Sequence, residues 1–336
     1  MRTRQLTAYA PRSLTLEEFD LPDVPDPGHV LTETTCTLIS TGTELANWVG
    51  NTTQRRPLGQ DWRAQPYRPG YSSVGRVVAV GAGVDGVRVG DRVSGQGNHA
   101  SAAVLDASRV AVVPDAVTDE RAAFATLLMI TMNAVRLARI ELGDRVASVG
   151  LGLIGNLALQ LARICGATPV AGTDLLAQRR AYAEAMHLHA VDPAASDFQE
   201  QVAALTGGKR FDVVFESTGS PAGLSPALKL AGRHARVVAL GSTRGLVEQF
   251  DLYGDIHLPG ISLIGAHMMT APEHANFSNR WTALANRKVG LQLLAEGRLD
   301  VESLVSHRAT PEQAADLFAL LADRREEAMG VLLNWT

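Results

Sequence analysis

The residues with the clearest chemical meaning form a glycine-rich turn in the middle of the chain. An apolar run, Val146–Val149, leads into a Gly-x-Gly-x-x-Gly pattern, and apolar side chains then recur at helical spacing. In a strand–turn–helix unit the first glycine permits the tight turn, the second lets the main chain approach a pyrophosphate, and the third lets the helix pack closely on the strand. The N–H groups at the start of the helix favour the phosphate charge. The pattern predicts a dinucleotide site at Gly150, Gly152, Leu153, Ile154 and Gly155.

An acidic residue marks the end of the next predicted strand. The strand Pro169–Thr173 is followed by Asp174, which lies 19 residues after Gly155 (174 − 155). A carboxylate at this place binds the hydroxyls of the adenosine ribose and repels a 2′-phosphate, so it favours NAD over NADP. Arg179 and Arg180 lie just downstream and could meet a phosphate instead. The alternative for these arginines is a solvated helix face that at most stacks on adenine.

The composition limits the class of protein. The chain has 336 residues, enough for two domains with their own cores. Its formal net charge of −4 shows no basic excess, which argues against a nucleic-acid partner. No apolar run reaches the ~18 residues that a membrane span needs. Two cysteines, Cys36 and Cys165, are too few for a disulfide scaffold and are expected to fill core space. We expect a reduced, cytoplasmic protein that acts on a small-molecule substrate.

The pattern of secondary structure changes along the chain. Residues 1–118 carry short strand-like runs separated by Gly, Pro and Asp, and the polar stretch 51–70 is expected to be a loop. The sequence then becomes helical, with helices predicted at 120–128 and 131–139. Strands and helices alternate from there to residue 267, which predicts a parallel, doubly wound α/β sheet. The remainder, 268–336, is expected to return and complete the N-terminal domain.

Two loops that follow buried strands of this sheet carry hydroxyl groups. The strands 211–215 and 236–240 are continuous apolar runs, as expected when both faces of a strand are covered. The residues of interest in the two loops are Ser217, Thr218, Gly241 and Ser242. Ligands bind outside the carboxyl ends of the strands in open α/β sheets. The loops are therefore expected to line the nucleotide site, and the alternative is that they are ordinary connecting turns.

Three further segments resemble one family. The segments Gly81-x-Gly83-Val84…Val89-Gly90-Asp91-Arg92-Val93, 211–219 and Gly330-Val331-Leu332-Leu333 are similar to parts of the medium-chain dehydrogenases/reductases. This superfamily includes zinc alcohol and polyol dehydrogenases as well as zinc-free quinone and enoyl reductases. The resemblance implies a GroES-like, β-rich catalytic domain built from residues 1–118 and 268–336, and a Rossmann NAD(P)-binding domain at 119–267. It also implies a homodimer that pairs edge strands around Ile261–Ala266.

The resemblance breaks down at the metal site. Zinc members carry Cys-Gly-Thr/Ser-Asp and Gly-His-Glu segments whose Cys and His bind the metal, whereas the matching residues here are Thr41-Gly42-Thr43-Glu44 and Gly70-Tyr71-Ser72. The stretch 123–129, which should supply a third ligand, contains no Cys, His, Asp or Glu, and no four-cysteine lobe follows Val93. Zinc needs three or four N, S or O ligands. We predict a branch that lacks both catalytic and structural zinc, and a zinc enzyme with unusual ligands is the remaining alternative.

Hydride transfer without a metal needs a general acid or base and a hydrogen-bond donor for the developing oxyanion. Tyr71 could donate to the substrate oxygen, Glu44 could accept a proton, and Thr43 lies where the family has a hydroxyl relay. His99 follows a glycine-rich turn and could also transfer a proton. Each has a structural alternative, because Tyr71 could fill the vacated volume, Glu44 could pair with an arginine, Thr43 could cap a turn and His99 could be a buried or surface residue.

These expectations favour one function and leave two others open. The first is a zinc-independent, NAD-dependent dehydrogenase acting on a secondary alcohol or its ketone, such as a polyol, cyclitol, sugar or secondary metabolite. The second is a zinc-free, NADPH-dependent enoyl or quinone reductase, which a preference for NADPH would reveal. The third is a non-catalytic nucleotide-binding protein, which would bind the cofactor without turnover.

Overall fold

The chain folds into two compact units. The computed structural model describes residues 1–50, 66–248, 250–272, 274–277 and 279–336, so most of the loop expected at 51–70 lies outside the described residues. One unit comprises 1–129 and 273–336, and the other comprises 130–272. The first boundary falls inside α3 (Ala125–Ala138), later than residue 118. The reason is that α2 (Asp119–Ala122) packs on β3, β4 and α8 of the first unit.

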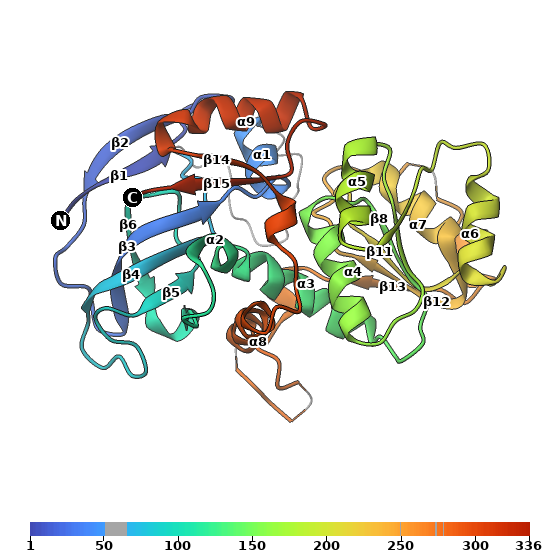
Figure 1. The fold of residues 1–336 in the computed structure, drawn as a ribbon, viewed down its shortest axis with the longest axis horizontal. Coiled ribbons are helices and arrows are strands. Elements are labelled where there is room, and N and C mark those ends of the chain that lie inside the picture. Colours follow the sequence, from blue (N-terminus) through green and yellow to red (C-terminus); the bar gives the residue numbers. More distant parts are fainter. Residues whose placement is uncertain (51–65, 249, 273, 278) are drawn as a thin grey trace. The chain divides into compact units, whose positions relative to one another are not determined.

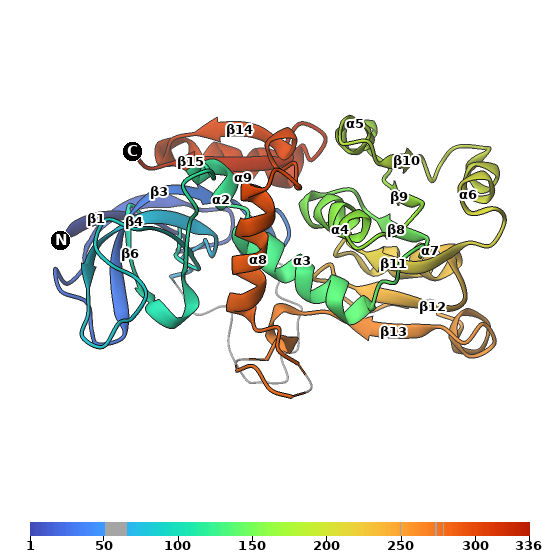
Figure 2. The same ribbon diagram turned by 60° about the horizontal axis from the view of Figure 1, so that its bottom comes forward.

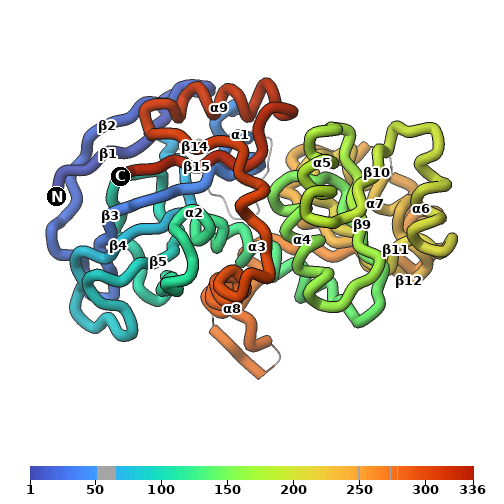
Figure 3. Tube along the Cα trace, in the orientation of Figure 1, coloured from blue at the N-terminus to red at the C-terminus, as the bar shows by residue number. Residues whose placement is uncertain are grey.

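A mixed sheet forms the base of the first unit. Its described strands follow the order β14-β15-β3-β4-β5-β7, and β6 also pairs with β3. The described pairs are antiparallel except β14–β15, which is parallel. The last strand, β15, pairs with β3, and Figures 1 and 3 show these red and blue segments side by side. The strands are β3 (His29–Leu38), β4 (Ser73–Val80), β5 (Arg92–Gly95), β6 (Ala102–Asp106), β7 (Ala111–Val112), β14 (Val305–Ala309) and β15 (Gly330–Asn334).

A hairpin and several helices complete the first unit. β1 (Arg2–Thr7) and β2 (Thr15–Asp20) form an antiparallel pair. The remaining helices of this unit are α1 (Thr43–Trp48), α8 (Ala283–Ala295), α9 (Ala314–Asp323) and the 3₁₀ turns η1 (Ala107–Arg109), η5 (Glu302–Leu304) and η6 (Pro311–Gln313). α1 packs against α9, and the rings of Trp48 and Phe318 meet edge-on with their centroids 5.7 Å apart. Because this aromatic pair is buried, it fixes the short helix that begins with Thr43 and Glu44.

The second unit is the parallel sheet that the sequence predicts. Its strands follow the order β10-β9-β8-β11-β12-β13, which can be traced from top to bottom in Figure 2, and every pair is parallel. Right-handed crossovers put α4 and α5 on one face and α6 and α7 on the other. The strands are β8 (Val146–Val149), β9 (Val170–Thr173), β10 (His189–Val191), β11 (Phe211–Glu216), β12 (Ala231–Ala239) and β13 (Ser262–Gly265). The helices are α4 (Leu153–Ile164), α5 (Ala177–Ala185), α6 (Phe198–Thr206), α7 (Leu224–Leu230), η2 (Pro221–Gly223), η3 (Leu252–His257) and η4 (Met268–Thr270).

Some local predictions were wrong. The helices expected at 120–128 and 131–139 are instead the short α2, capped by Thr118, and the single helix α3. β14 was not expected, because its residues alternate too little in polarity to mark a strand. Cys36 is buried as predicted, but Cys165 is exposed. Cys165 is the C-cap of α4, beyond the last turn that faces the sheet.

The helical stretch 119–138 is the part of the described chain that passes a membrane-span test on length and composition alone. Most of it, 78% of the most apolar window, is buried inside the protein. The core helix of a globular protein passes the same test, so this is weak support for a membrane span.

Candidate functional site

The glycine turn has the geometry that a bound pyrophosphate requires. Gly150 adopts a φ of +94°, which favours glycine, and its N–H donates to the carbonyl of Thr173 at 2.8 Å. A Cβ atom at Gly155 would lie 2.1 Å from the carbonyl oxygen of Gly150, so only glycine lets α4 pack this closely on the turn. At Gly152 the nearest atom to an added Cβ is Nη1 of Arg179, 4.0 Å away, and no side chain caps α4 there. The start of α4, at Leu153 and Ile154, therefore presents main-chain N–H groups beside a glycine with open space, and these residues fit a nicotinamide dinucleotide.

Asp174 is held rigidly at the end of β9. One carboxylate oxygen accepts the N–H of Leu151 at 2.9 Å, and the other accepts the N–H of Leu176 at 2.9 Å. Its side chain is only 8% exposed. Each carboxylate oxygen has two lone pairs, so both can still accept a ribose hydroxyl.

The two neighbouring arginines have different roles. Arg180 donates to the carbonyls of Asp174 and Leu175 and pairs with Asp192 at 2.8 Å, so its guanidinium is held by neighbouring groups of the protein. Arg179 lies 3.6 Å from the Asp174 carboxylate, and its Nε has no hydrogen-bond partner in the described structure. Arg179 is therefore the basic side chain that lies beside the glycine turn.

The structure brings the two hydroxyl-bearing loops up to the glycine turn. The hydroxyls of Ser148 and Ser217 are 3.0 Å apart. A Cβ at Gly150 would lie 3.0 Å from the methyl group of Thr218, and a Cβ at Gly241 would lie 2.4 Å from the main-chain nitrogen of Gly219. Ser242 lies next to Gly219, because the carbonyl oxygen of Ser242 would be 3.4 Å from a Cβ at Gly219. The cofactor residues predicted in this unit thus form one contiguous surface.

In the first unit, Glu44 and His99 form a buried pair. Nε2 of His99 lies 2.8 Å from Oε2 of Glu44, and the residues are 0% and 1% exposed. Nδ1 of His99 lies 2.8 Å from the Thr37 hydroxyl, which also accepts the indole N–H of Trp335 at 3.0 Å. The expectation that Glu44 could pair with an arginine is wrong, because its ionisable partner is His99. Both side chains are sealed from solvent, so we assign them to the support of the site and not to contact with substrate.

Tyr71 reaches this pair through a residue that the sequence did not single out. The Tyr71 hydroxyl donates to the hydroxyl of Ser40, and the Ser40 N–H donates to Oε1 of Glu44 at 3.0 Å. Gly70 makes this possible, because a Cβ there would lie 2.2 Å from the main-chain nitrogen of His99. Tyr71 is half-buried, whereas Ser40 is buried. Ser40 could have been predicted as a site residue only from its position just before the segment Thr41-Gly42-Thr43-Glu44.

Thr43 is the first residue of α1, and Gly42 occupies the N-cap position without a side-chain hydrogen bond to the helix. The alternative in which Thr43 caps a turn therefore does not describe its place, since it lies inside the helix. Its catalytic role stays a prediction.

The residues at the expected metal position do not fit a zinc site. Thr41 and Tyr71 stand where the zinc members have Cys and His. In the part of the chain that the structure describes, no group of three or more His, Cys, Asp or Glu residues could hold a metal ion. Cys36 is buried in β3, and burial raises the pKa of its thiol well above the usual range. Zinc binds the thiolate, so Cys36 is a poor ligand.

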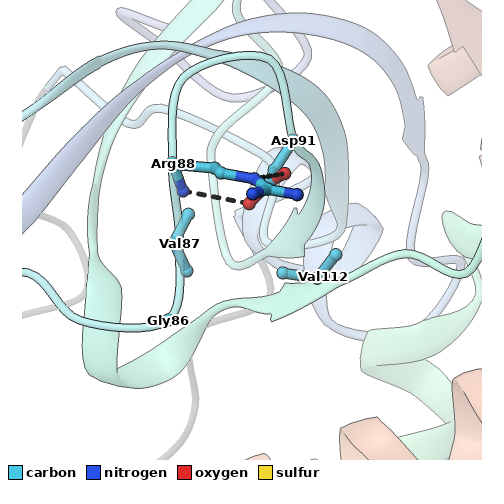
Figure 4. Close-up of a pocket in the computed structure, with 5 residues that line it drawn as sticks. All are labelled: Gly86, Val87, Arg88, Asp91 and Val112. Carbon is cyan, nitrogen blue, oxygen red and sulfur yellow. Dashed lines mark hydrogen bonds and ion pairs between the residues drawn. The ribbon is translucent and has the colours of Figure 1, made fainter.

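A surface depression elsewhere in the first unit does not involve the site residues. It has a volume of about 380 Å³ and is lined by Gly86, Val87, Arg88, Asp91 and Val112 (Figure 4). The Asp91 carboxylate accepts the Arg88 N–H at 2.9 Å, which closes the turn between β4 and β5. We assign this depression to the packing of the turn.

Comparison with known proteins gives a consistent result. Residues 154–286 match the family model described as zinc-binding dehydrogenase. D-guloside 3-dehydrogenase of Escherichia coli is 25% identical over 268 residues, covering 78% of this chain and 75% of that protein. Sorbitol dehydrogenase of Bacillus subtilis is 23% identical over 301 residues, covering 80% and 81%. The chain is therefore similar to zinc-binding dehydrogenases and to dehydrogenases of sugars and polyols.

Solved structures of dehydrogenases share the fold along nearly the whole chain. Galactitol-1-phosphate dehydrogenase of Escherichia coli has a TM-score of 0.84 at 21% identity, covering 98% of this chain and 99% of that one. Two other neighbours, each with a TM-score of 0.82 and 99% coverage of both chains, carry cofactors. One is an Escherichia coli alcohol dehydrogenase with NADH, at 20% identity, and the other is a Sinorhizobium meliloti protein with NADP, at 21%. At these identities the likeness establishes the GroES-like and Rossmann folds.

The family model does not reach the metal position. Its matched range, 154–286, excludes Thr41, Tyr71 and the stretch 123–129. This match therefore gives no information on zinc binding, which has to be judged from the residues themselves.

Proposed function

We propose that this chain is a medium-chain dehydrogenase/reductase, and that it is a zinc-independent oxidoreductase that transfers a hydride between NAD(H) and a secondary alcohol or its ketone, of the polyol or sugar class. The observation that carries the proposal is the glycine turn anchored to Asp174 by the Leu151 N–H. The relatives named for guloside and sorbitol support the substrate class. The anchored carboxylate supports NAD, because it is held where it can accept ribose hydroxyls.

The residues of the first unit have distinct parts in this function. The dinucleotide, when bound, supplies or accepts the hydride. In ketone reduction Tyr71 transfers its hydroxyl proton to the substrate oxygen and becomes a phenolate, to which the Ser40 hydroxyl then donates. In alcohol oxidation this phenolate accepts the proton of the substrate hydroxyl. Ser40 orients the phenol group through the hydrogen bond between the two hydroxyls. Glu44 fixes Ser40 by accepting its main-chain N–H, and His99 holds Glu44 in turn.

Zinc independence rests on the chemistry of the replaced ligands. A phenol hydroxyl can donate a hydrogen bond to an oxyanion without a metal, and Tyr71 provides one at the position of the family's histidine ligand. Purified protein that turns over a polyol or sugar with substoichiometric metal, measured by elemental analysis, would support this part of the proposal. Activity that requires one zinc per chain would contradict it.

The choice between NAD and NADP provides a direct test. Calorimetric titration of the wild-type protein is expected to give NADH a dissociation constant at least about tenfold below that of NADPH. Asp174→Asn should weaken NADH binding and improve NADPH binding, because it removes the charge that repels the 2′-phosphate. Arg179→Ala should weaken NADPH binding and leave NADH binding nearly unchanged.

Arg180→Ala is the matched control. It removes the adjacent guanidinium, whose partners are two carbonyls and Asp192, so it should lower stability without changing the ratio of the two affinities. A wild-type preference for NADPH would contradict the proposal. It would favour the second candidate, a zinc-free NADPH-dependent enoyl or quinone reductase, for which the position of Arg179 beside the turn is the supporting observation.

We further propose that the protein is a cytoplasmic homodimer that pairs its β13 strands. Among the described strands β13 pairs with β12 alone, so its other edge offers main-chain groups to a second strand. Leu263 on this edge is 46% exposed, and Leu252 and Tyr253 nearby are 63% and 64% exposed. Sedimentation at micromolar concentration should show a dimer, and Leu263→Glu should shift it to monomer. Leu142→Glu, at an exposed position away from β13, should remain dimeric, and a monomeric wild type would contradict the proposal.

A further inference from the structure

Glu216 is a buried carboxylate that joins two loops of the second unit. It ends β11, and the residue is only 2% exposed. Oε1 accepts the Thr218 N–H at 2.8 Å and also the Thr218 hydroxyl. Oε2 accepts the Thr243 hydroxyl at 3.1 Å. The carboxylate therefore bonds to the loop after β11 with one oxygen and to the loop after β12 with the other.

The main chain and three glycines tighten the same junction. The Glu216 carbonyl accepts the N–H of Gly241 at 2.7 Å. A Cβ at Gly241 would lie 2.4 Å from the Gly219 nitrogen, and a Cβ at Gly223 would lie 2.4 Å from Oε1 of Glu216. A Cβ at Gly241 would overlap main-chain atoms, and a Cβ at Gly223 would push the ends of the Glu216 and Thr218 side chains aside. The two loops are thus packed around the carboxylate as one preformed surface.

This surface lies on the side of the sheet where the second half of a dinucleotide must bind. β8 is flanked by β9 and β11, and the chain order reverses there. Asp174 follows β9 and defines the adenosine side, so the other half of the molecule extends over the ends of β11 and β12. Thr218 is exposed and its methyl group lies against Gly150 of the turn, which connects this surface to the pyrophosphate position.

We propose that Glu216 is a positioning residue for the nicotinamide half of the cofactor, acting through Thr218 and Thr243. The inference rests on the proposed function, because it assumes that the second unit binds a nicotinamide dinucleotide. Glu216 itself is buried and does not touch the cofactor. It holds the two loops at a fixed separation, and a loosened pair of loops has to be ordered again at each binding event, which costs affinity.

The test compares two ligands that differ in the nicotinamide alone. Full-length protein is titrated calorimetrically with NADH and with ADP-ribose, which lacks the nicotinamide ring. Thr243→Val removes the hydrogen bond to Oε2. Gly223→Ala displaces Oε1 and the Thr218 hydroxyl that donates to it, without removing the carboxylate. Both variants are expected to bind NADH about tenfold more weakly and ADP-ribose within about twofold of wild type. Thr206→Val is the matched control, because it removes a hydroxyl that donates to the Val202 carbonyl within α6 and belongs to neither loop.

Each outcome has a definite meaning. Equal weakening of NADH and ADP-ribose would indicate a general structural role and overturn the inference. Unchanged affinity for both ligands in the two variants would also overturn it. If Gly223→Ala fails to fold, Thr243→Val decides, because it is nearly isosteric. A wild-type protein that binds neither ligand would overturn the proposed function and this inference with it, whereas normal ADP-ribose binding shows that the proposed cofactor site stands.

Discussion

Alanine at Gly152 is expected to reduce NADH affinity by at least about a hundredfold while leaving the melting temperature of the protein unchanged. In the folded protein a Cβ at this position has open space, with its nearest neighbour 4.0 Å away. The same methyl group would occupy the place where a pyrophosphate approaches the main chain at the start of α4. The variant therefore tests whether Gly152 is required for NADH binding and not for the stability of the fold.

Gly155→Ala is the matched comparison, because it changes the third glycine of the same turn. Its Cβ would lie 2.1 Å from the Gly150 carbonyl oxygen and 3.0 Å from the Ser148 hydroxyl. Overpacking of this kind costs about 1–3 kcal/mol, so this variant should lose both stability and cofactor binding. Thermal unfolding and calorimetric titration of the two variants provide the measurements. Normal NADH binding by Gly152→Ala would mean that no pyrophosphate approaches the turn there.

Tyr71→Phe is expected to lower kcat by about 10²- to 10⁴-fold, the usual contribution of a general acid or base. The ring remains in place, so the packing around it is kept and only the phenol hydroxyl is lost. NADH affinity should be unchanged, because Tyr71 belongs to the unit formed by 1–129 and 273–336 and the dinucleotide turn to the other. Steady-state kinetics with a panel of polyols, sugars and their ketones would provide the measurement.

Ser40→Ala refines this test. It keeps the Tyr71 hydroxyl and removes the neighbouring hydroxyl that accepts its hydrogen bond. If Ser40 orients the phenol group, kcat should fall by roughly tenfold, less than in Tyr71→Phe. Undiminished turnover of Tyr71→Phe on a substrate that the wild type uses would remove Tyr71 from the mechanism.

Much of the second unit could be predicted because its signals are local. The glycine turn and the apolar period of α4 each lie within a few residues. The strand β11 could be predicted from the sequence because both of its faces are buried, and burial of both faces requires a continuous apolar run. Short-range backbone geometry and burial determine such elements, so the sequence alone identifies them and the dinucleotide turn between them.

The sequence also limited the candidate site residues in the first unit to a few, but it did not determine the role of each side chain. Replacement of the metal ligands is visible in the residues Thr41 and Tyr71. The sequence does not indicate that Glu44 pairs with His99, which is 55 positions away. Nor did it indicate that Thr37 would bond to Trp335, which is 298 positions away. The second pair forms because β15 returns to lie beside β3. In the first, main-chain bonds to Pro69 and Leu6 hold His99, and no local pattern encodes either arrangement.

Neighbouring residues show most clearly what the tertiary structure decides. Arg179 and Arg180 are chemically identical and adjacent, yet Arg180 bonds to the Asp174 carbonyl and Asp192, while Arg179 lies beside Gly152. Successive residues of a helix point about 100° apart, so one arginine faces β10 and the other faces the turn. The sequence by itself determined which residue types could bind a dinucleotide. The tertiary structure decided which of them are within reach of it, because direction in space depends on how each helix packs on the sheet.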